Sequence, residues 1–418
     1  MLIILCDQWQ RFVMPGAGDK DLVAPHIARL TKQSVEFTRA YVSNPVCSPS
    51  RAALQTGRYG TAVGMPWNNR LMDTGASCIA DRFAAAGYKT GYIGKWHLDG
   101  EPRPGFVPKD RRRGYQYWAA FNRGHVYYAS TYFEDSDTPI ARGGFEPDYQ
   151  TALAVDFIQR NAGDPFFLFV SFGPPHTPRR APERHAALYK PERFALRDNV
   201  PYKYQPEARK QRVGYYGLCS ALDDCVGKLL AALDEKRLSE DTIVVFTADH
   251  GDMLGSHGLE FKGVWHEESA GVPLLIRWPR RLKPGVKQDW LFNNVDMAPT
   301  LAGLCGVEPP ADAHGEDRSA LVLRGEGEKP ESIYVQGRIG TNGEWRMIVR
   351  GWDKLVVDRE RKPIHLYNLA QDPLELNDLI NERGSVRKQE ELVALMRRWI
   401  LKTGDRVPYP GRAPQEEP

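Results

Sequence analysis

The segment NPVCSPSRAALQTGR (44–58) holds a cysteine, a proline and an arginine within five consecutive positions. A structural cysteine is usually found among apolar residues, whereas Cys47 lies in a polar, turn-forming stretch. The chain is expected to enter a helix near Ser48–Pro49, so the positive end of that helix and its free N–H groups point at the cysteine. Arg51 adds a full positive charge nearby. The segment therefore predicts that Cys47 is a reacting residue whose surroundings bind an anionic group.

Ionisable side chains also follow four predicted strands elsewhere in the chain. An aspartate directly after a strand is by itself most often a helix cap or a turn former. Here several separate segments present such groups at the carboxyl ends of strands, which is where an open α/β sheet binds its ligands. The residues are Asp7 and Gln8 after strand 2–6, Lys95 and His97 after 89–94, His176 after 165–172, and Asp249 and His250 after 242–247.

These groups divide into a metal-binding set and a cationic set. The first set supplies mostly oxygen donors and one imidazole, which suits a hard divalent cation such as Ca²⁺ or Mg²⁺, with Mn²⁺ as the alternative that the imidazole allows. The second set would surround that ion with positive charge, an arrangement that receives a multiply oxygenated anion of the sulfate or phosphate type. The metal-binding set is Asp7, Gln8, Asp249 and His250, and the cationic set is Arg51, Lys95, His97, His176 and Lys262.

Apolar runs that alternate with helical patterns over the first three quarters of the chain must position these groups. The runs are continuously apolar, as in PFFLFVSF (165–172), which is typical of parallel strands covered on both faces. We therefore expect an α/β fold with a mixed, largely parallel central sheet sandwiched by helices. Predicted strands are 2–6, 35–42, 89–94, 165–172, 241–249 and 272–278, and predicted helices are 78–87, 213–236 and 295–306.

The pattern changes near residue 320. SIYVQG, RMIVRG and KLVVD are short strand-like runs broken by turns, and ELVALMRRWILK (391–402) has helical spacing. We expect a catalytic domain at 1–325 and a small C-terminal α+β domain with an antiparallel sheet at 326–418, ending in an extended tail from residue 406. The stretch 98–148 is unusually long for a connector, so it is either a functional insertion or contains elements that the pattern does not reveal.

The composition limits the class of protein. The 418 residues include 56 basic and 53 acidic ones, a formal net charge of +3, which is too balanced to predict a nucleic-acid or membrane-surface partner. No apolar run approaches the ~20 residues of a membrane span. Six scattered cysteines without CxxC pairs argue against a disulfide scaffold. No signal peptide is recognised, so we expect the cytoplasm if the chain is complete, and the periplasm or secretion if a leader has been removed.

The same residues lie in motifs that resemble the formylglycine-dependent (type I) sulfatases of the alkaline phosphatase superfamily. CSPSRAALQTG (47–57) matches every defined position of the pattern C-x-P-S-R-x-x-x-L-x-T-G, and GYKTGYIGKWH (87–97) is similar to G-Y-x-T-x-x-x-G-K-x-H. PFFLFVSFGPPHTP, TIVVFTADHGDMLGSHG, FKGVWHEESAGVPLLIRWP and HLYNLAQDPLELNDL resemble further blocks of that family in the same order. The resemblance therefore covers nearly the whole chain.

This resemblance implies hydrolysis of an organic sulfate ester, either a small-molecule (aryl) or a saccharide sulfate, to an alcohol and inorganic sulfate. It also implies a maturation partner, a formylglycine-generating or anaerobic enzyme that oxidises Cys47 to formylglycine, whose hydrated aldehyde is the nucleophile. One divalent cation, by preference Ca²⁺, would be held by the metal-binding set and the modified cysteine. By this match the ligands are Asp7, Gln8, Cys47, Asp249 and His250.

Matching the cationic set to the family gives each member an expected role. Arg51 would hold and polarise the formylglycine, and Lys95 would bind the sulfate oxygens. His97 would accept the proton of the second aldehyde-hydrate hydroxyl, because an imidazole is a base near neutral pH. His176 and Lys262 would bind the transferring group and protonate the leaving oxygen.

The chain departs from the common family pattern at the metal site. Many sulfatases have two adjacent carboxylates after the first strand, whereas this chain has Asp7 and Gln8, and His250 stands where many have asparagine. Both features resemble choline sulfatases and phosphonate monoester hydrolases, so the alternative function is hydrolysis of a phosphonate monoester or phosphodiester. The GKWH block with Lys95 and His97 favours the sulfatase. An alternative from a different class is a catalytically silent binder of sulfated ligands, in which the cysteine stays unmodified.

Two further residues are predicted to contact the substrate. Asn68 follows Cys47 at a distance where family members often place an asparagine near the site. Trp118, together with Tyr127 and Tyr128, lies in the stretch 98–148 and is expected to form a wall of the pocket. The five other cysteines lie on apolar patterns and are expected to be small core residues.

Overall fold

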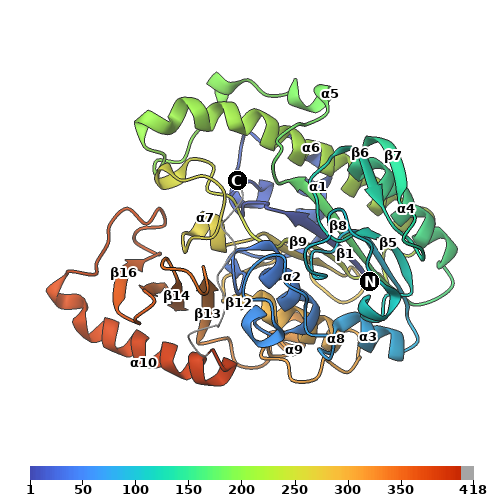
Figure 1. Cartoon of the computed structure of the whole chain (residues 1–418). Helices are drawn as coiled ribbons and strands as arrows, with labels where there is room; N and C mark the ends of the chain where they lie inside the picture. Colours follow the sequence, from blue (N-terminus) through green and yellow to red (C-terminus); the bar gives the residue numbers. More distant parts are fainter. Residues whose placement is uncertain (406–418) are drawn as a thin grey trace.

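The computed structural model describes residues 1–405, which surround an eight-stranded central sheet (Figure 1). Its strands in spatial order are β11 (Lys287–Gln288), β2 (Val35–Phe37), β10 (Leu274–Arg277), β9 (Val244–Ala248), β1 (Leu2–Asp7), β8 (Phe166–Pro175), β4 (Lys89–Lys95) and β5 (Tyr117–Phe121). β1 pairs in parallel with β8 and β9, and β4 pairs in parallel with β8 and β5. β10 runs antiparallel to both of its neighbours. The prediction of a mixed, largely parallel sheet is therefore confirmed.

Helices cover both faces of this sheet, because its central strands are apolar on both sides. Every residue of β1 and β8 is buried, so each face needs a covering layer. The layer above the sheet in Figure 1 is α1 (Pro25–Gln33), α4 (Glu146–Arg160) and α6 (Gln205–Glu235), with the short α5 (Glu183–Ala186) packed on α6. The layer below is α2 (Cys47–Thr56), α3 (Ile79–Ala85), α8 (Met297–Leu304) and α9 (Ser319–Arg324). None of the helices within residues 1–405 is long and apolar enough to span a membrane.

A second, smaller sheet forms the C-terminal part. It contains β13 (Ser332–Gly337), β14 (Trp345–Arg350), β15 (Asp353–Val357) and β16 (Pro363–Asn368), each antiparallel to the one before it. α10 (Val386–Thr403) packs against this sheet. The predicted C-terminal α+β unit is confirmed, whereas the boundary at residue 325 stays a prediction. The predicted tail from residue 406 lies outside the described residues.

Several predicted bounds differ from the structure. The run 35–42 is two strands, because β3 (Ala40–Tyr41) leaves the central sheet to pair with β12 (Phe292–Asn293). The stretch 98–148 contains β5 and the antiparallel pair β6 (Tyr128–Tyr132) and β7 (Ile140–Phe145). The predicted helix at 213–236 starts earlier, at the first residue of α6. A short α7 (Glu267–Ala270) also interrupts the chain before β10.

A buried ionic network joins the C-terminal sheet to the larger part of the chain, which holds the central sheet. The ammonium of Lys354 on β15 lies 3.1 Å from Oε1 of Glu267 and 2.7 Å from Oε1 of Glu375. The backbone N–H of Glu267 donates to Glu375, and Arg11 pairs with Glu267 from the other side. Two cations thus balance two carboxylates, and Lys354, Glu267 and Glu375 are all buried. A buried set of this kind depends on every member, because removing one leaves an unpaired charge.

We expect Lys354→Met to lower the free energy of unfolding by about 3–5 kcal/mol. The substitution keeps most of the side-chain volume but leaves two buried carboxylates facing one cation. Thermal and urea unfolding followed by circular dichroism would measure the change. Lys362→Met is the matched control, since Lys362 lies in an exposed pair with Glu360 and should leave the unfolding midpoint unchanged. Equal midpoints for the two variants would contradict a structural role for the network.

Candidate active site

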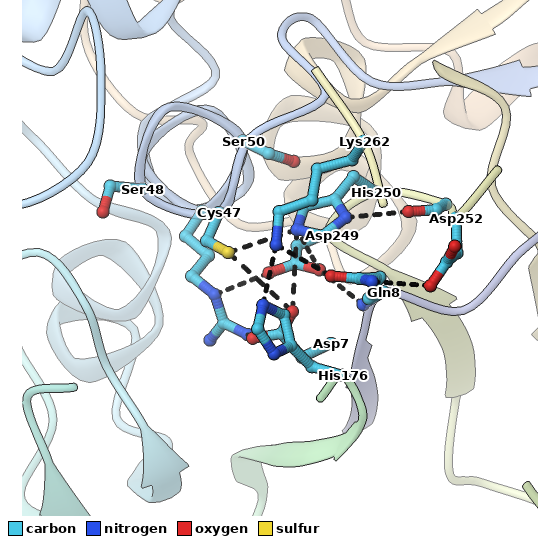
Figure 2. A network of polar contacts seen from close by, with 12 residues as sticks. Asp7, Gln8, Cys47, Ser48, Ser50, His176, Asp249, His250, Asp252 and Lys262 are labelled. Carbon is cyan, nitrogen blue, oxygen red and sulfur yellow. Dashed lines mark hydrogen bonds and ion pairs between the residues drawn. The ribbon is translucent and has the colours of Figure 1, made fainter. Parts of the chain in front are cut away.

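The carboxyl ends of four parallel strands meet at one edge of the sheet and carry the predicted site residues. Asp7 is the last residue of β1 and Lys95 is the last of β4. His176 directly follows β8, and Asp249 directly follows β9. Because these strands are neighbours, residues far apart in sequence come together. Figure 2 shows that seven of the site's side chains face one another: Asp7, Gln8, Cys47, His176, Asp249, His250 and Lys262.

Cys47 is the first residue of α2, and its side chain points at the predicted metal ligands. Its Sγ lies 3.1 Å from Nε2 of His250 and 3.8 Å from Oδ1 of Asp7. The pKa of this thiol lies below its usual value. Burial, and then the Asp7 carboxylate, act to raise it, but the surrounding cations, of which Lys95 and Lys262 act most strongly, outweigh both. The structure therefore places residue 47 at a positive helix end among cationic side chains.

Three of the predicted metal ligands, Asp7, Asp249 and His250, lie close enough together to hold one divalent cation. Nε2 of His250 lies 3.6 Å from Oδ1 of Asp7 and 3.6 Å from Oδ1 of Asp249. Nδ1 of His250 contacts the carbonyl of Gly251 at 3.0 Å. An N–H there fixes the tautomer and leaves the Nε2 lone pair facing the two carboxylates. With Cys47, the ligand atoms lie within 4.8 Å of one another, so this donor set fits one hard cation.

Arg51 occupies the carboxylate oxygens that face away from this cluster. Its Nε donates to Oδ2 of Asp249 at 2.8 Å, and its Nη2 donates to Oδ2 of Asp7 at 3.2 Å. Its Nη1 donates to the carbonyl of Lys95 and to the hydroxyl of Ser171. Each aspartate thus gives its Oδ2 to the guanidinium, and its Oδ1 lies on the side of His250, where Oδ1 of Asp249 also accepts the backbone N–H of Gln8 at 3.1 Å. The arginine contacts these two carboxylates, not Cys47, so its expected contact with formylglycine stays a prediction.

Gln8 is held by two side chains, of which one was not predicted. Its backbone adopts φ +69°, and its Nε2 donates to Oδ2 of Asp252 at 2.6 Å. Its Oε1 accepts from Lys262 at 2.8 Å. Asp252 also accepts from Arg179 at 2.7 Å, so a buried carboxylate orients the amide. The role of Gln8 as a metal ligand stays a prediction.

Two lysine–histidine pairs lie beside this cluster. Nζ of Lys262 lies 2.7 Å from Nε2 of His176, and Nζ of Lys95 lies 3.2 Å from Nε2 of His125. Burial first, and then the neighbouring cationic groups, lower the pKa of both histidines well below its usual value. His125 was not among the predicted residues. Its only signal in the sequence is a place in the long stretch 98–148, two residues before Tyr127.

His97 and the two asparagines after α2 lie at the side of the site. Nε2 of His97 is 3.1 Å from Oδ1 of Asn69, and its Nδ1 has no hydrogen-bond partner within residues 1–405. His97 is 6% exposed at φ +62°. Oδ1 of Asn68 accepts the backbone N–H of Ser48 at 2.9 Å. The structure thus gives Asn68 a contact at the start of α2, and its contact with substrate stays a prediction.

The position of Trp118 differs from the expected one. The structure places it in the hydrophobic core, 2% exposed, stacked on Tyr92 at 5.3 Å and edge-on to Trp96. This position does not support the prediction of a pocket wall, because the residue lies on β5 and packs against the neighbouring strand β4. Tyr127 has a supporting position, since its hydroxyl lies 2.7 Å from the carbonyl of His176.

The family follows from this fold, this site and one comparison. The Sulfatase family model matches residues 1–307 of the chain. The chain belongs to the sulfatase family. A second model, N-sulphoglucosamine sulphohydrolase, C-terminal, matches residues 255–402.

This sulfatase is 34% identical to an ulvan-active sulfatase from Formosa agariphila, over 97% of its own length and 81% of the relative. It is 27% identical to an endo-4-O-sulfatase from Bacteroides thetaiotaomicron, over 92% and 88%. It is thus a sulfuric ester hydrolase.

Solved structures agree on the fold. The sulfatase superposes on a structure named for the sulfatase yidJ from Bacteroides fragilis with a TM-score of 0.90 at 26% identity, covering 97% of this chain and 96% of that one. A phosphonate monoester hydrolase of Agrobacterium radiobacter shares the fold with a TM-score of 0.78 at 21% identity, covering 97% and 95%. Membership of the family implies in general a metal ion and a formylglycine, and the cluster around Cys47 fits both.

Proposed function

We propose that this sulfatase removes sulfate from a sulfated saccharide, with a formylglycine made from Cys47 and a Ca²⁺ ion. The observation that carries the proposal is the position of Cys47. It lies at the first turn of α2, against two carboxylates and an imidazole, and beside two lysine–histidine pairs. The saccharide class is supported by the names of the ulvan-active and endo-4-O-sulfatase relatives.

The residues that would hold the cation are Asp7, Asp249 and His250, with Gln8 and the modified residue 47 as further ligands. Oxygen donors predominate, which favours Ca²⁺ over a softer metal, with Mg²⁺ and Mn²⁺ as alternatives. When bound, the ion withdraws electrons from the sulfate oxygens. Arg51 keeps the two carboxylates in place by donating to Oδ2 of each.

Formylglycine would supply a hydrated aldehyde with two hydroxyls, of which one attacks sulfur and the other, once deprotonated, allows sulfate to leave. The maturation partner is a formylglycine-generating or anaerobic enzyme. His97 is the base for that proton. Its Nε2 contacts Oδ1 of Asn69 and its side chain is buried. These two features hold the imidazole ring in one orientation.

The lysines bind the sulfate oxygens, and Lys262 carries the proton for the leaving oxygen. The ammonium of Lys262 has only donors, so Nε2 of His176 accepts from it at 2.7 Å. Nδ1 of His176 lies 2.8 Å from the carbonyl of Thr177 and therefore carries the other hydrogen. The imidazole is thus neutral and acts as the acceptor that aligns Lys262 as an acid.

We expect the acid limb of the pH profile of kcat/KM to lie below pH 6.5. Burial first, and then Lys95 and Arg51, lower the pKa of His97 well below its ordinary value, and a base works only while it is neutral. A lowered pKa keeps it neutral to lower pH, so activity falls only when the pH drops through that value. Initial rates on one substrate, with the fold checked at each pH by circular dichroism, would measure this. An acid limb centred above pH 6.5 would contradict the role of His97.

The substrate is tested by release of inorganic sulfate from a panel of sulfated saccharides, choline sulfate and an aryl sulfate, using protein made together with a maturation enzyme. We expect the highest kcat/KM on a saccharide. An aryl phosphonate is assayed beside this panel by release of its phenol, because Gln8 stands where many sulfatases have a second carboxylate. A strong preference for the phosphonate would favour that alternative, and a preparation that binds sulfated ligands without turnover would favour the silent binder.

A further inference from the structure

His125 belongs to one lysine–histidine pair and stacks on the histidine of the other. It lies in the loop between β5 and β6, with its Nε2 3.2 Å from Nζ of Lys95. Its ring stacks on His176, with centroids 3.7 Å apart and planes inclined by 7°. The hydroxyl of Tyr127 lies 3.5 Å from its Nδ1. One imidazole from the long insertion thus touches the sulfate-binding lysine on its edge and the leaving-group histidine on its face.

The direction of the contact with Lys95 is fixed by chemistry. An ammonium has three donors and no acceptor, so Nε2 of His125 must accept. A second donor of Lys95 is given to Oδ2 of Asp7 at 2.5 Å. These two acceptors bind two of the three ammonium hydrogens of Lys95, so the direction of the third N–H is fixed. His125 and Asp7 together set that direction.

The neighbouring pair has the same design. Lys262 donates to Oε1 of Gln8 at 2.8 Å and to Nε2 of His176 at 2.7 Å, which also leaves one hydrogen. The stacked rings of His125 and His176 hold the two acceptors side by side. A shift of the His125 ring would therefore change the direction of the third N–H on Lys95 and remove the support behind His176.

We propose that His125 is a positioning residue for sulfate ester hydrolysis, which aims Lys95 at a sulfate oxygen and supports the ring that aligns Lys262 with the leaving oxygen. The inference rests on the proposed function, because it takes the roles of the two lysines from there. It differs from a purely structural role in one respect. Substrates whose leaving oxygen needs a proton should depend on His125 more than those with a stable phenolate leaving group.

The test compares three substitutions on two substrates. His125→Ala removes the acceptor and the ring, His125→Phe keeps a ring to stack on His176 but removes the acceptor, and His125→Gln keeps an acceptor for Lys95. We expect His125→Ala to lower kcat/KM on a saccharide sulfate by about 100-fold, the size of a positioning effect, and on 4-nitrophenyl sulfate by about tenfold. His125→Phe should lose less than His125→Ala on the saccharide, and His125→Gln should recover most of the loss on the aryl sulfate.

Val126→Ala is the matched control, because Val126 is the next residue of the loop and 54% exposed, and it should keep wild-type kinetics. Melting temperature and conversion of Cys47 are measured for every variant, so a folding or maturation defect is recognised. The inference is overturned if His125→Ala keeps wild-type kcat/KM, or loses the same factor on both substrates with no recovery in His125→Gln. A wild-type protein without any sulfate ester turnover would instead overturn the proposed function itself.

Discussion

Replacement of Cys47 by alanine is expected to lower kcat/KM for sulfate esters by at least about 10⁴-fold, to the background rate. In the proposed mechanism this side chain becomes the aldehyde, and the predicted metal ligands face it. Its Sγ lies within 4 Å of both His250 and Asp7. Because the residue is small and lies at a helix start, alanine should leave the fold intact. Sulfate release and thermal unfolding of the variant would measure both expectations.

Cys47→Ser separates the aldehyde from a simple hydroxyl. Serine offers one oxygen that can accept the sulfuryl group, but it has no second hydroxyl to expel it. We expect no multiple turnover and, after incubation with substrate, a mass gain of about 80 Da on the serine peptide. Cys305→Ala is the control, since Cys305 is a half-buried thiol away from the site, and it should keep the wild-type rate. Repeated turnover by the serine variant would contradict the mechanism.

Substitution of Asp249 by asparagine is the second change with a very large expected effect. Oδ1 of Asp249 faces His250, and its Oδ2 accepts from Arg51. Asparagine keeps the shape but removes a negative charge, and it can turn an N–H toward the cation. We expect loss of the bound metal and a fall in kcat/KM of at least about 10³-fold, in line with removal of an electrostatic centre. Metal content per chain and sulfate release would be measured together.

The control for this change is Asp241→Asn. Asp241 pairs with Arg280 at the protein surface, where its side chain is 61% exposed. Its replacement should change neither metal content nor rate. A fully active Asp249→Asn protein, or one that keeps a full complement of metal, would exclude Asp249 as a ligand. Retained metal with lost activity would leave the aspartate a catalytic role but contradict its role in affinity.

Regular features of the chain made most of the site predictable. Continuously apolar runs marked the parallel strands, and the polar residues after them fell at one sheet edge because carboxyl ends of parallel strands meet there. Asp7, Lys95, His176 and Asp249 were found in this way. Cys47 stood out because a thiol in a polar helix start has no packing reason to be there. Local pattern and topology agreed at these positions.

The residues that were missed or misplaced depend on contacts between distant segments. His125 lies in a loop without periodicity, and only tertiary packing brings it to Lys95 and His176. Trp118 was assigned to the pocket from its place in an insertion, but an aromatic side chain on a strand is more readily buried than exposed. Its stacking on Tyr92 shows that outcome. Neither the position of His125 beside Lys95 nor the burial of Trp118 can be read from the local spacing of residues.

The measurement that tests the central claim most directly is the mass of the peptide that contains residue 47, taken from enzyme made with its maturation partner and active on a sulfate ester. Conversion of the thiol to an aldehyde lowers the peptide mass by about 18 Da. We predict that this lighter peptide is present and that sulfate release rises in proportion to its fraction. Active enzyme in which the peptide carries only an unmodified cysteine would contradict the account.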